Sequence, residues 1–258
     1  MTDEREYSPG EMMVVSAARL LEDGDRVLVG IGLPNLAANL AKRLHAPNLV
    51  LFYEAGVVDA APARLPLSIG DPCLVTGAVS VCSMFDLFYL YLQRGLVDVG
   101  FLGAAQVDRY GNINSTVIGE YERPKVRLGG SGGACDIALS CRKTLILLPH
   151  AKRRFPEKVD FITSPGYLGG RSEREALGFR GGPEAVVTDL GLLKFDENGE
   201  MFLYALNPKA TVEQILENTG WNLKVADDVK VLDPPTDEEL RILREELDPN
   251  RVYLGRLD

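Results

Sequence analysis

Residues 25–53 constrain the fold of this chain more than any other segment. An apolar run at 27–29, preceded by Asp25 and Arg26, leads into Gly30-Ile31-Gly32-Leu33-Pro34, and residues 35–44 are rich in helix formers. A second apolar run follows at 49–53. This order predicts a strand, a glycine-rich turn, a helix and a second strand, which form a βαβ unit with parallel strands. The sequence therefore predicts an α/β fold with an open, mostly parallel sheet flanked by helices.

The remainder of the chain continues this alternation and contains no internal repeat. Residues 160–185 are an exception, because their glycines and prolines predict a long ordered loop that serves as a site lid or an interface. We interpret residues 1–258 as a single domain. We expect helices at 11–23, 83–94, 211–218 and 236–247, buried strands at 97–103 and 144–148, and two or three antiparallel strands between 186 and 204.

Composition and charge exclude several classes of function. The chain has 258 residues, of which 46% are hydrophobic and 25% charged, so it can bury a large core. Its formal net charge of −9 argues against nucleic acid and anionic membrane as partners, because both require a basic surface. The N-terminus carries no signal pattern, and no apolar run reaches the roughly 20 residues of a membrane span, so we expect a cytoplasmic protein.

Cysteine and histidine usage argues against a metal site and against a disulfide framework. The four cysteines lack the paired spacing of zinc ligands, and the chain has only two histidines. We therefore expect reduced structural thiols, no metal and no Ser-His-Asp triad. These residues are Cys73, Cys82, Cys135, Cys141, His45 and His150.

Glu54 ends the second strand-like run and is followed by Ala55 and Gly56, which can turn. In an open parallel sheet the ligand crevice lies beyond the carboxyl ends of the strands. A single acid at this point therefore predicts a nucleophile or a general base that faces substrate. The alternative is a structural carboxylate that caps a helix or pairs with its dipole.

Two further segments carry groups that could bind an anion or a carbonyl oxygen. Residues 129–133 hold four glycines in five positions before a helix-like run, so successive backbone N–H groups can converge on an oxyanion. The alternative is a flexible loop without a ligand. Gln106, Asn112 and Asn114 lie after a strand-like run and can donate hydrogen bonds without adding charge. Their alternative is an Asx-turn that only holds the loop together.

Together these segments resemble the β subunits of class I coenzyme A transferases. The resemblance is carried in order by Glu-x-Gly at 54–56, by Gly-Ala-x-Gln-Val-Asp-x-x-Gly-Asn-x-Asn at 103–114, and by Gly-Ser-Gly-Gly-Ala at 130–134. It spans nearly the whole chain and is closer still to the glutaconate CoA-transferase β subunit. The additional similar segments are 30–34, 152–155, 163–166, 187–189 and 217–220.

The resemblance implies a reaction and a set of site residues. Glu54 would attack an acyl-CoA thioester, form a mixed anhydride and then a glutamyl-CoA thioester, and so move CoA to a short carboxylic or dicarboxylic acid such as glutaconate. Coenzyme A would enter as acyl-CoA substrate, with no permanently bound cofactor. The residues that would assist are Gly132, Gly133 and Gln106 at the oxyanion, and Gly30, Gly32, Asn112, Asn114, Gly130 and Ser131 along the CoA channel.

The resemblance also implies a partner, because the acid pocket in these enzymes comes largely from an α subunit of similar fold. We expect this chain to be inactive alone and to form an αβ heterodimer, assembled further to a heterotetramer or heterooctamer. The expected interface comes from residues 160–185 and the C-terminal segment.

Two departures from the family pattern leave alternatives open. Ala55 follows the glutamate where relatives often carry Ser or Asn, and Cys135 replaces a residue that is Asn in the glutaconate enzyme. Cys135 is interpreted as a packed small hydrophobe, with a reactive thiol near a helix start as its alternative. The same fold hosts decarboxylases and hydrolases of CoA esters, and a third hypothesis is a non-catalytic α/β module that senses a ligand.

Overall fold

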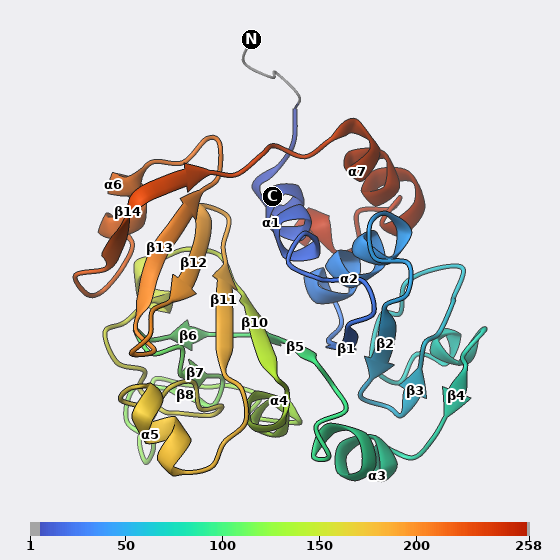
Figure 1. The fold of residues 1–258 in the computed structure, drawn as a ribbon, viewed down its shortest axis with the longest axis horizontal. Helices are drawn as coiled ribbons and strands as arrows, with labels where there is room; N and C mark the ends of the chain where they lie inside the picture. Colours follow the sequence, from blue (N-terminus) through green and yellow to red (C-terminus); the bar gives the residue numbers. More distant parts are fainter. Residues whose placement is uncertain (1–5, 257–258) are drawn as a thin grey trace. The chain divides into compact units, whose positions relative to one another are not determined.

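The computed structural model describes residues 6–256, and the chain divides into two compact units (Figure 1). The first unit runs to Phe101 and resumes at Asp233, whereas the second holds Leu102–Leu232. The single domain expected over residues 1–258 stays a prediction beside this division.

The sheet of the first unit has the strand order β5-β1-β2-β3-β4. β1 pairs in parallel with both β2 and β5, whereas β3 and β4 are antiparallel additions at the edge. The helix between β1 and β2 completes the βαβ unit, so this prediction is confirmed. The strands are β1 (Arg26–Val29), β2 (Val50–Tyr53), β3 (Val57–Val58), β4 (Ser80–Val81) and β5 (Val99–Gly103).

Helix α1 is almost entirely buried and packs against α2, which in turn contacts η4. A capping box between Ser8 and Glu11, with Pro9 in the first turn, starts α1 earlier than the sequence predicted, and α1 ends at Ala18. Glu11 is buried and binds Arg244, which ties the C-terminal helix to α1. The helices are α1 (Pro9–Ala18), α2 (Leu33–Arg43), η1 (Pro72–Val75), α3 (Met84–Asp86), η2 (Leu87–Leu92), α7 (Asp237–Arg241), η4 (Ile242–Leu247) and η5 (Leu254–Arg256).

The main sheet of the second unit has the order β14-β13-β12-β11-β10. β10 and β11 are parallel, β11, β12 and β13 are antiparallel, and β13 pairs in parallel with β14. The expected antiparallel strands are therefore confirmed, and β14 is an addition that the sequence did not predict. The strands are β10 (Lys143–Leu147), β11 (Pro183–Val187), β12 (Gly191–Phe195), β13 (Met201–Leu206) and β14 (Lys224–Val231).

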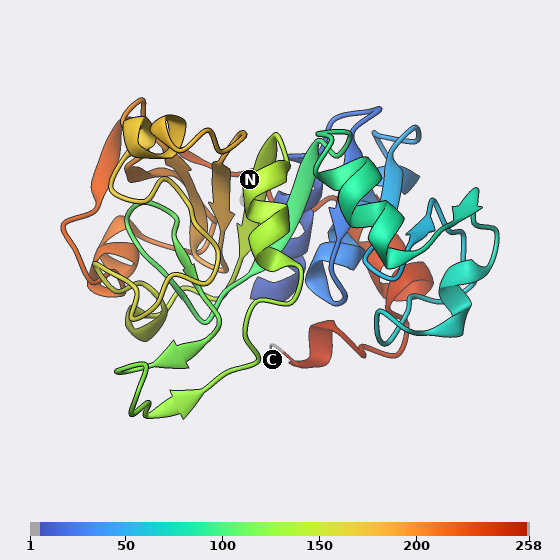
Figure 2. The same cartoon turned by 90° about the horizontal axis from the view of Figure 1, so that it is seen from below.

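Two short hairpins and four helices complete the second unit. Figure 2 shows the β8–β9 hairpin projecting from the rest of this unit. The hairpins are β6 (Gln106–Val107) with β7 (Ile113–Asn114) and β8 (Val117–Ile118) with β9 (Val126–Arg127). The helices are α4 (Ala134–Ser140), η3 (Lys152–Arg154), α5 (Arg171–Ala176) and α6 (Val212–Glu217), which Thr211 and Gln214 cap as the sequence predicted.

The loop expected at 160–185 contains α5 and is held by one buried side chain. Arg174 is 1% exposed, and its guanidinium donates hydrogen bonds to the carbonyl oxygens of Pro165 (3.0 Å), Gly166 (2.8 Å) and Gly181 (2.9 Å). It also donates to the carbonyl oxygens of Ala138 and Arg180. No carboxylate takes part in these five bonds, so the charge of Arg174 is stabilised by backbone dipoles. The role of this loop as lid or interface stays a prediction.

Three of the segments that carry the family resemblance meet at His150 in the core of the second unit. The ring nitrogens of His150 lie 3.3 Å from Thr188 Oγ1 and 3.1 Å from Thr219 Oγ1. Phe155 stacks on the ring with centroids 4.1 Å apart, and the backbone N–H of His150 donates to Asp189. Burial lowers the pKa of His150 to about 4, so the ring is neutral near pH 7. The segments are 152–155, 187–189 and 217–220, and their visible role here is structural.

Candidate active site

Glu54 lies in a tight turn at the carboxyl end of a parallel strand. The turn joins β2 to β3, and the N–H of Gly56 donates to the carbonyl oxygen of Tyr53 at 2.8 Å. Gly56 has φ +97°, and a Cβ there would lie 2.1 Å from the carbonyl oxygen of Cys82. Only glycine fits this position without a backbone shift. The hydrogen bond to Tyr53 and the close approach to Cys82 therefore fix the turn that holds Glu54.

The carboxylate of Glu54 is half-buried and makes no hydrogen bond or ion pair with residues 6–256. Glu54 caps no helix in the described residues, because strand β3 follows the turn. Pairing of this acid with a helix dipole stays an untested alternative. The next helix, η1, begins at Pro72 and is capped by Asp71. A half-buried carboxylate without a partner inside the described chain remains available to a ligand.

Neighbouring polar side chains of the first unit meet at the buried Asn35, whose Oδ1 accepts hydrogen bonds and whose Nδ2 has no partner in the described residues. The Tyr53 hydroxyl donates to Asn35 Oδ1 at 3.2 Å, and Asn39 donates to the same oxygen at 2.8 Å. Burial raises the pKa of Tyr53 to about 12, so its hydroxyl stays protonated. Lys42 pairs with Asp59. These contacts hold β2 against α2.

The turn before α2 has open space beside its two glycines, Gly30 and Gly32. A Cβ added at Gly30 or Gly32 would meet no heavy atom within 4 Å, and Gly32 has φ +97° immediately before the helix. Backbone N–H groups at such a helix start can receive an anionic ligand. A role for Gly30 and Gly32 along a CoA channel stays a prediction.

The amides of the second unit are used inside the protein, which corrects the sequence interpretation. Gln106 donates to Asp160 at 3.1 Å, and its oxygen accepts bonds from Asn114 and from the Asp160 backbone N–H. Asn114 is 0% exposed, donates also to the Val117 carbonyl oxygen at 2.6 Å, and accepts from the backbone N–H of Thr116. Neither side chain is presented to a ligand, so the roles expected for Gln106 at an oxyanion and Asn114 at CoA are not supported.

Asn112 is corrected on the same grounds. It is 2% exposed, donates to Asp108 and to the Leu168 carbonyl oxygen, and accepts from the N–H groups of Gly166 and Leu168. All four hydrogen-bonding positions of this amide are therefore satisfied. Asn112 fastens the 163–168 segment to the 108–112 turn, which is the structural alternative that the sequence left open.

The glycine loop at 129–133 precedes α4. The N–H of Gly130 donates to the Ser115 carbonyl oxygen and Ser131 Oγ accepts from the N–H of Cys135, so both residues have structural partners. A Cβ at Gly132 would meet no atom within 4 Å, and Gly133 is the N-cap of the helix. Backbone donors at such a position lack intrahelical partners. The oxyanion role of Gly132 and Gly133, and the contact of Gly130 and Ser131 with CoA, stay predictions.

The cysteines behave as structural thiols in the structure. None of the four forms a disulfide within residues 6–256, and burial raises the pKa of Cys135. A raised pKa disfavours the nucleophilic thiolate, which supports the packed interpretation of Cys135 over the reactive one. Within residues 6–256, no group of three or more His, Cys, Asp or Glu side chains is arranged to hold a metal ion. The same residues include no helix long and apolar enough to cross a membrane.

Comparison with known proteins matches this geometry to a family. The coenzyme A transferase family model matches residues 11–218. The B subunit of 3-oxoadipate CoA-transferase from Pseudomonas knackmussii is 50% identical over 240 residues, covering 92% of this chain and 92% of that protein. The B subunit of glutaconate CoA-transferase from Acidaminococcus fermentans is 41% identical over 261 residues, covering 98% and 97%.

A solved structure extends this similarity to three dimensions. The crystal structure of glutaconate coenzyme A-transferase from Acidaminococcus fermentans matches with a TM-score of 0.92 and 39% identity, covering 98% of this chain and 99% of that one. The resemblance drawn from the motifs and the fold class drawn from the strand pattern are both confirmed.

Proposed function

This chain belongs to the coenzyme A transferase family, and we propose that it uses Glu54 to move CoA between an acyl-CoA and a short carboxylic acid. It is the B-type subunit of an enzyme, by its similarity to two such subunits. The single observation that carries the role of Glu54 is its position. It is a half-buried carboxylate without a partner in residues 6–256, at the carboxyl end of parallel strand β2.

The proposed reaction is a double exchange on this carboxylate. A Glu54 oxygen attacks the thioester carbonyl carbon, the C–S bond breaks, and a mixed anhydride and CoA thiolate form. The thiolate then attacks the Glu54 carbonyl carbon and expels the donor acid as a carboxylate, which leaves a glutamyl-CoA thioester. The acceptor carboxylate enters, and the two steps run in reverse. No proton needs to be transferred, because each nucleophile and each leaving group is an anion.

Transfer is favoured over decarboxylation or hydrolysis of a CoA ester. Two relatives, 50% and 41% identical to this chain, both carry the name of a transferase, and each covers more than nine tenths of it. The carboxylate that transfer requires is also present and unpaired within the described residues. A ligand-sensing module would not require such a nucleophile.

The names of the relatives indicate the acid and the partner. Both 3-oxoadipate and glutaconate are dicarboxylic acids, so we propose a short dicarboxylic acid as donor or acceptor. Similarity to the B-type half of two transferases implies an α subunit, the A-type half, as partner. Assembly of the resulting heterodimer into a heterotetramer or heterooctamer is part of the proposal, as is acyl-CoA as the carrier substrate.

The experiment that tests the proposal traps the adduct. The chain is co-expressed with its α subunit, incubated with acyl-CoA and quenched with borohydride or hydroxylamine, and the peptide that contains Glu54 is examined by mass spectrometry. We expect modification of Glu54 in the wild type and none in Glu54→Gln. The matched control is Glu120→Gln, which removes an exposed carboxylate of the second unit and should leave adduct and turnover unchanged. Full turnover by Glu54→Asp and Glu54→Gln complexes would refute the proposal.

A further inference from the structure

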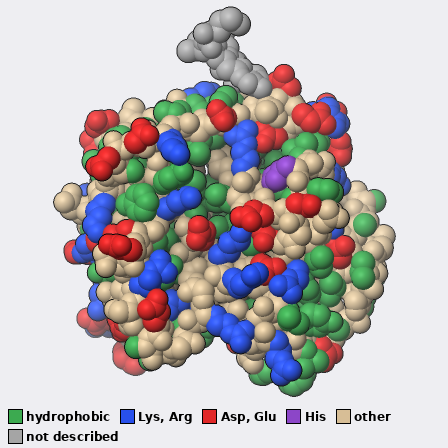
Figure 3. Space-filling view, in the orientation of Figure 1, with side chains coloured by type: hydrophobic (Ala, Val, Ile, Leu, Met, Phe, Trp, Pro, Cys, Tyr) green, Lys and Arg blue, Asp and Glu red, His purple; other side chains and the backbone are tan. Residues whose placement is uncertain are grey.

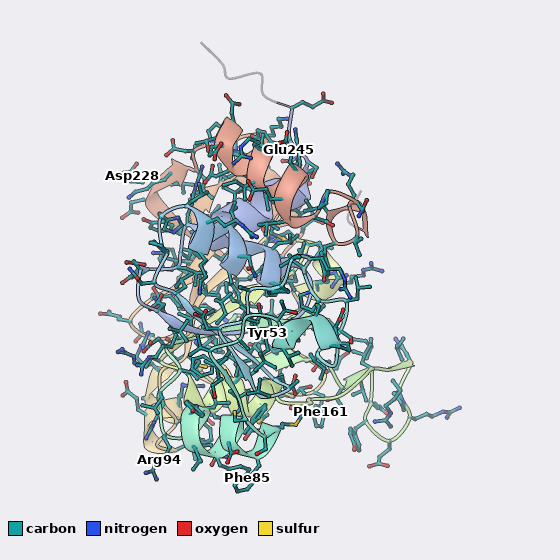
Figure 4. All side chains as sticks on the ribbon, turned by 90° about the vertical axis from the view of Figure 1, so that its right-hand side faces the viewer. Tyr53, Phe85, Arg94, Phe161, Asp228 and Glu245 are labelled. Carbon is teal, nitrogen blue, oxygen red and sulfur yellow. The ribbon has the colours of Figure 1, made fainter. Side chains whose placement is uncertain are left out.

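The helix that follows β4 exposes apolar side chains on its outer side. Its inner side is also apolar, because Leu87 and Leu92 are fully buried and Tyr91 packs on Phe52 of β2 with ring centroids 5.6 Å apart. A helix that is apolar all round is normally covered on all sides. Figure 4 shows Phe85 at the outer edge of this helix, with its ring directed away from the ribbon.

The outer side continues onto β4 to give one apolar surface. Val79 and Val81 lie two residues apart on a strand-like segment, and two-residue spacing places side chains on the same face. β4 is the last strand of its sheet, so its outer edge is unpaired within the described chain. We call this the 79–90 surface, and its members and exposed fractions are Val79 (76%), Val81 (61%), Met84 (49%), Phe85 (63%), Tyr89 (49%) and Leu90 (52%).

The size of the 79–90 surface exceeds that of incidental apolar exposure. A large aromatic side chain offers roughly 150–250 Å², and a valine, leucine or methionine side chain somewhat less. Six side chains that are each about half exposed or more therefore amount to roughly 500–700 Å². This approaches the roughly 800 Å² that each partner buries in a stable interface. Figure 3 shows the hydrophobic side chains of this region gathered at the lower right, over the place of α3 in Figure 1.

The low charge of this surface favours an apolar protein surface as its binding partner. Residues 79–93 contain one charged side chain, Asp86, which accepts hydrogen bonds from the N–H and hydroxyl of Ser83 in a helix cap. The segment offers no Lys or Arg to a nucleic acid or an anionic membrane. Phe85 and Tyr89 stack on each other at 4.5 Å, which presents a pre-ordered aromatic pair of the type found at interface centres.

The surface is continuous with the Glu54 turn. The N–H of Cys82 donates to the Gly56 carbonyl oxygen at 2.9 Å, and Val57 of β3 pairs with Val81 of β4. A chain seated on Val81 and Phe85 would therefore lie beside the turn that holds Glu54. This is where the second half of the enzyme has to be if it supplies the acid pocket.

We infer that the 79–90 surface docks the α subunit through a complementary apolar face. The inference rests on the proposed function, since the function requires this partner. The subunit contact then depends on Phe85 and Leu90, whereas the chemistry depends on Glu54, so the two can be separated by experiment.

The test uses the co-expressed complex and the double variant Phe85→Asp/Leu90→Asp. We expect a rise of about 100-fold or more in the dissociation constant for the α subunit, measured by sedimentation, because charges would be placed at the interface centre. The matched control is Val231→Asp, which changes a 63% exposed valine of the second unit outside residues 160–185 and should leave the constant unchanged. In wild-type protein, hydrogen exchange of amides 79–92 should slow on addition of the α subunit, a readout that needs no variant.

Three outcomes overturn the inference. Unchanged affinity together with unchanged exchange would show that the α subunit docks elsewhere. A wild-type homodimer that the double variant dissociates, with α-subunit affinity intact, would assign the surface to a second copy of this chain. An intact complex with a raised KM for acyl-CoA would assign it to the substrate. A Glu54→Gln complex that assembles normally but keeps full turnover would instead refute the proposed function and leave the docking surface standing.

Discussion

Replacement of Arg174 by Met tests whether one buried guanidinium holds the 164–182 loop. The substitution keeps the apolar stem and removes five hydrogen bonds to backbone carbonyl oxygens. A buried acceptor that loses its donor costs about 1–3 kcal/mol. Five such acceptors, partly relieved by water that enters as the loop opens, predict a loss of about 4–5 kcal/mol in unfolding free energy.

The assay combines urea unfolding of the purified chain with hydrogen exchange. For a chain of this length a loss of that size lowers Tm by roughly 10–20 °C. Amides within 164–182 should exchange fastest, because the loop loses its anchor before the sheet unfolds. Arg174→Lys, which can supply at most three of the five donors, should lose roughly half as much free energy.

The control for this prediction is Arg180→Met. The Arg180 side chain is exposed, and its carbonyl oxygen can still accept the bond from Arg174. We expect a change within about 0.5 kcal/mol. If Arg174→Met changed stability by less than about 1.5 kcal/mol and left the exchange of 164–182 as in the wild type, the assignment of Arg174 as the anchor would be refuted.

Three further predictions concern His150, Gly56 and Asn114. Burial lowers the pKa of His150 from 6.5 to about 4, so the unfolded chain takes up a proton on this ring at a higher pH than the folded chain does. The free energy of unfolding should therefore fall by about 3 kcal/mol as pH falls from 6.5 toward 4. His150→Gln should reduce the pH dependence of the unfolding free energy over this range, whereas His45→Gln, at an exposed position, should leave it unchanged. The same pH dependence in both variants would contradict the assignment. Gly56→Ala should lower the free energy of unfolding by about 3 kcal/mol or more, because φ is +97° there and the new Cβ would lie 2.1 Å from a carbonyl oxygen. The control Gly70→Ala should change it little, because a Cβ at Gly70 meets nothing within 4 Å. Asn114→Ala should cost about 2–3 kcal/mol with the KM for CoA within two-fold of the wild type, and a raised KM at unchanged stability would restore its binding role.

Local patterns carried most of the fold. The βαβ unit at 26–53 and the capping boxes at Thr211 and Thr236 depend on residues within a few positions of each other, and the structure contains them. β14 was missed because its sequence, Lys224 to Val231, alternates no hydrophobic face, and its strand conformation comes from backbone pairing with β13. Such pairing is set by tertiary context, which a single-sequence pattern does not record.

The proposed site was predictable to the extent that the chemistry proposed for it resides in one residue. Glu54 could be placed because an acid after a buried strand is a local signal, and the structure puts it at the strand end without a partner in residues 6–256. Gln106 could not be assigned in the same way, because its partner Asp160 lies 54 residues away. The sequence alone does not distinguish an amide that binds a ligand from an amide that binds a carboxylate far along the chain.

This difference explains why the segments that carry the resemblance divide into two kinds. The side chains of Asn112 and Asn114, and that of His150 where three other segments meet, are saturated by partners inside the chain, so they fix loop geometry and leave no donor for a substrate. Glu54 has no such partner in the described part of the chain. Gly56, two residues on, is held by backbone hydrogen bonds to Tyr53 and Cys82 and by its close approach to the Cys82 carbonyl oxygen. A constraint on backbone shape requires many residues, whereas an acyl exchange that transfers no proton requires one carboxylate in a fixed position. Substitutions in the first group should therefore lower stability and yield of the complex, whereas substitutions at Glu54 should abolish the adduct in a complex that is fully folded.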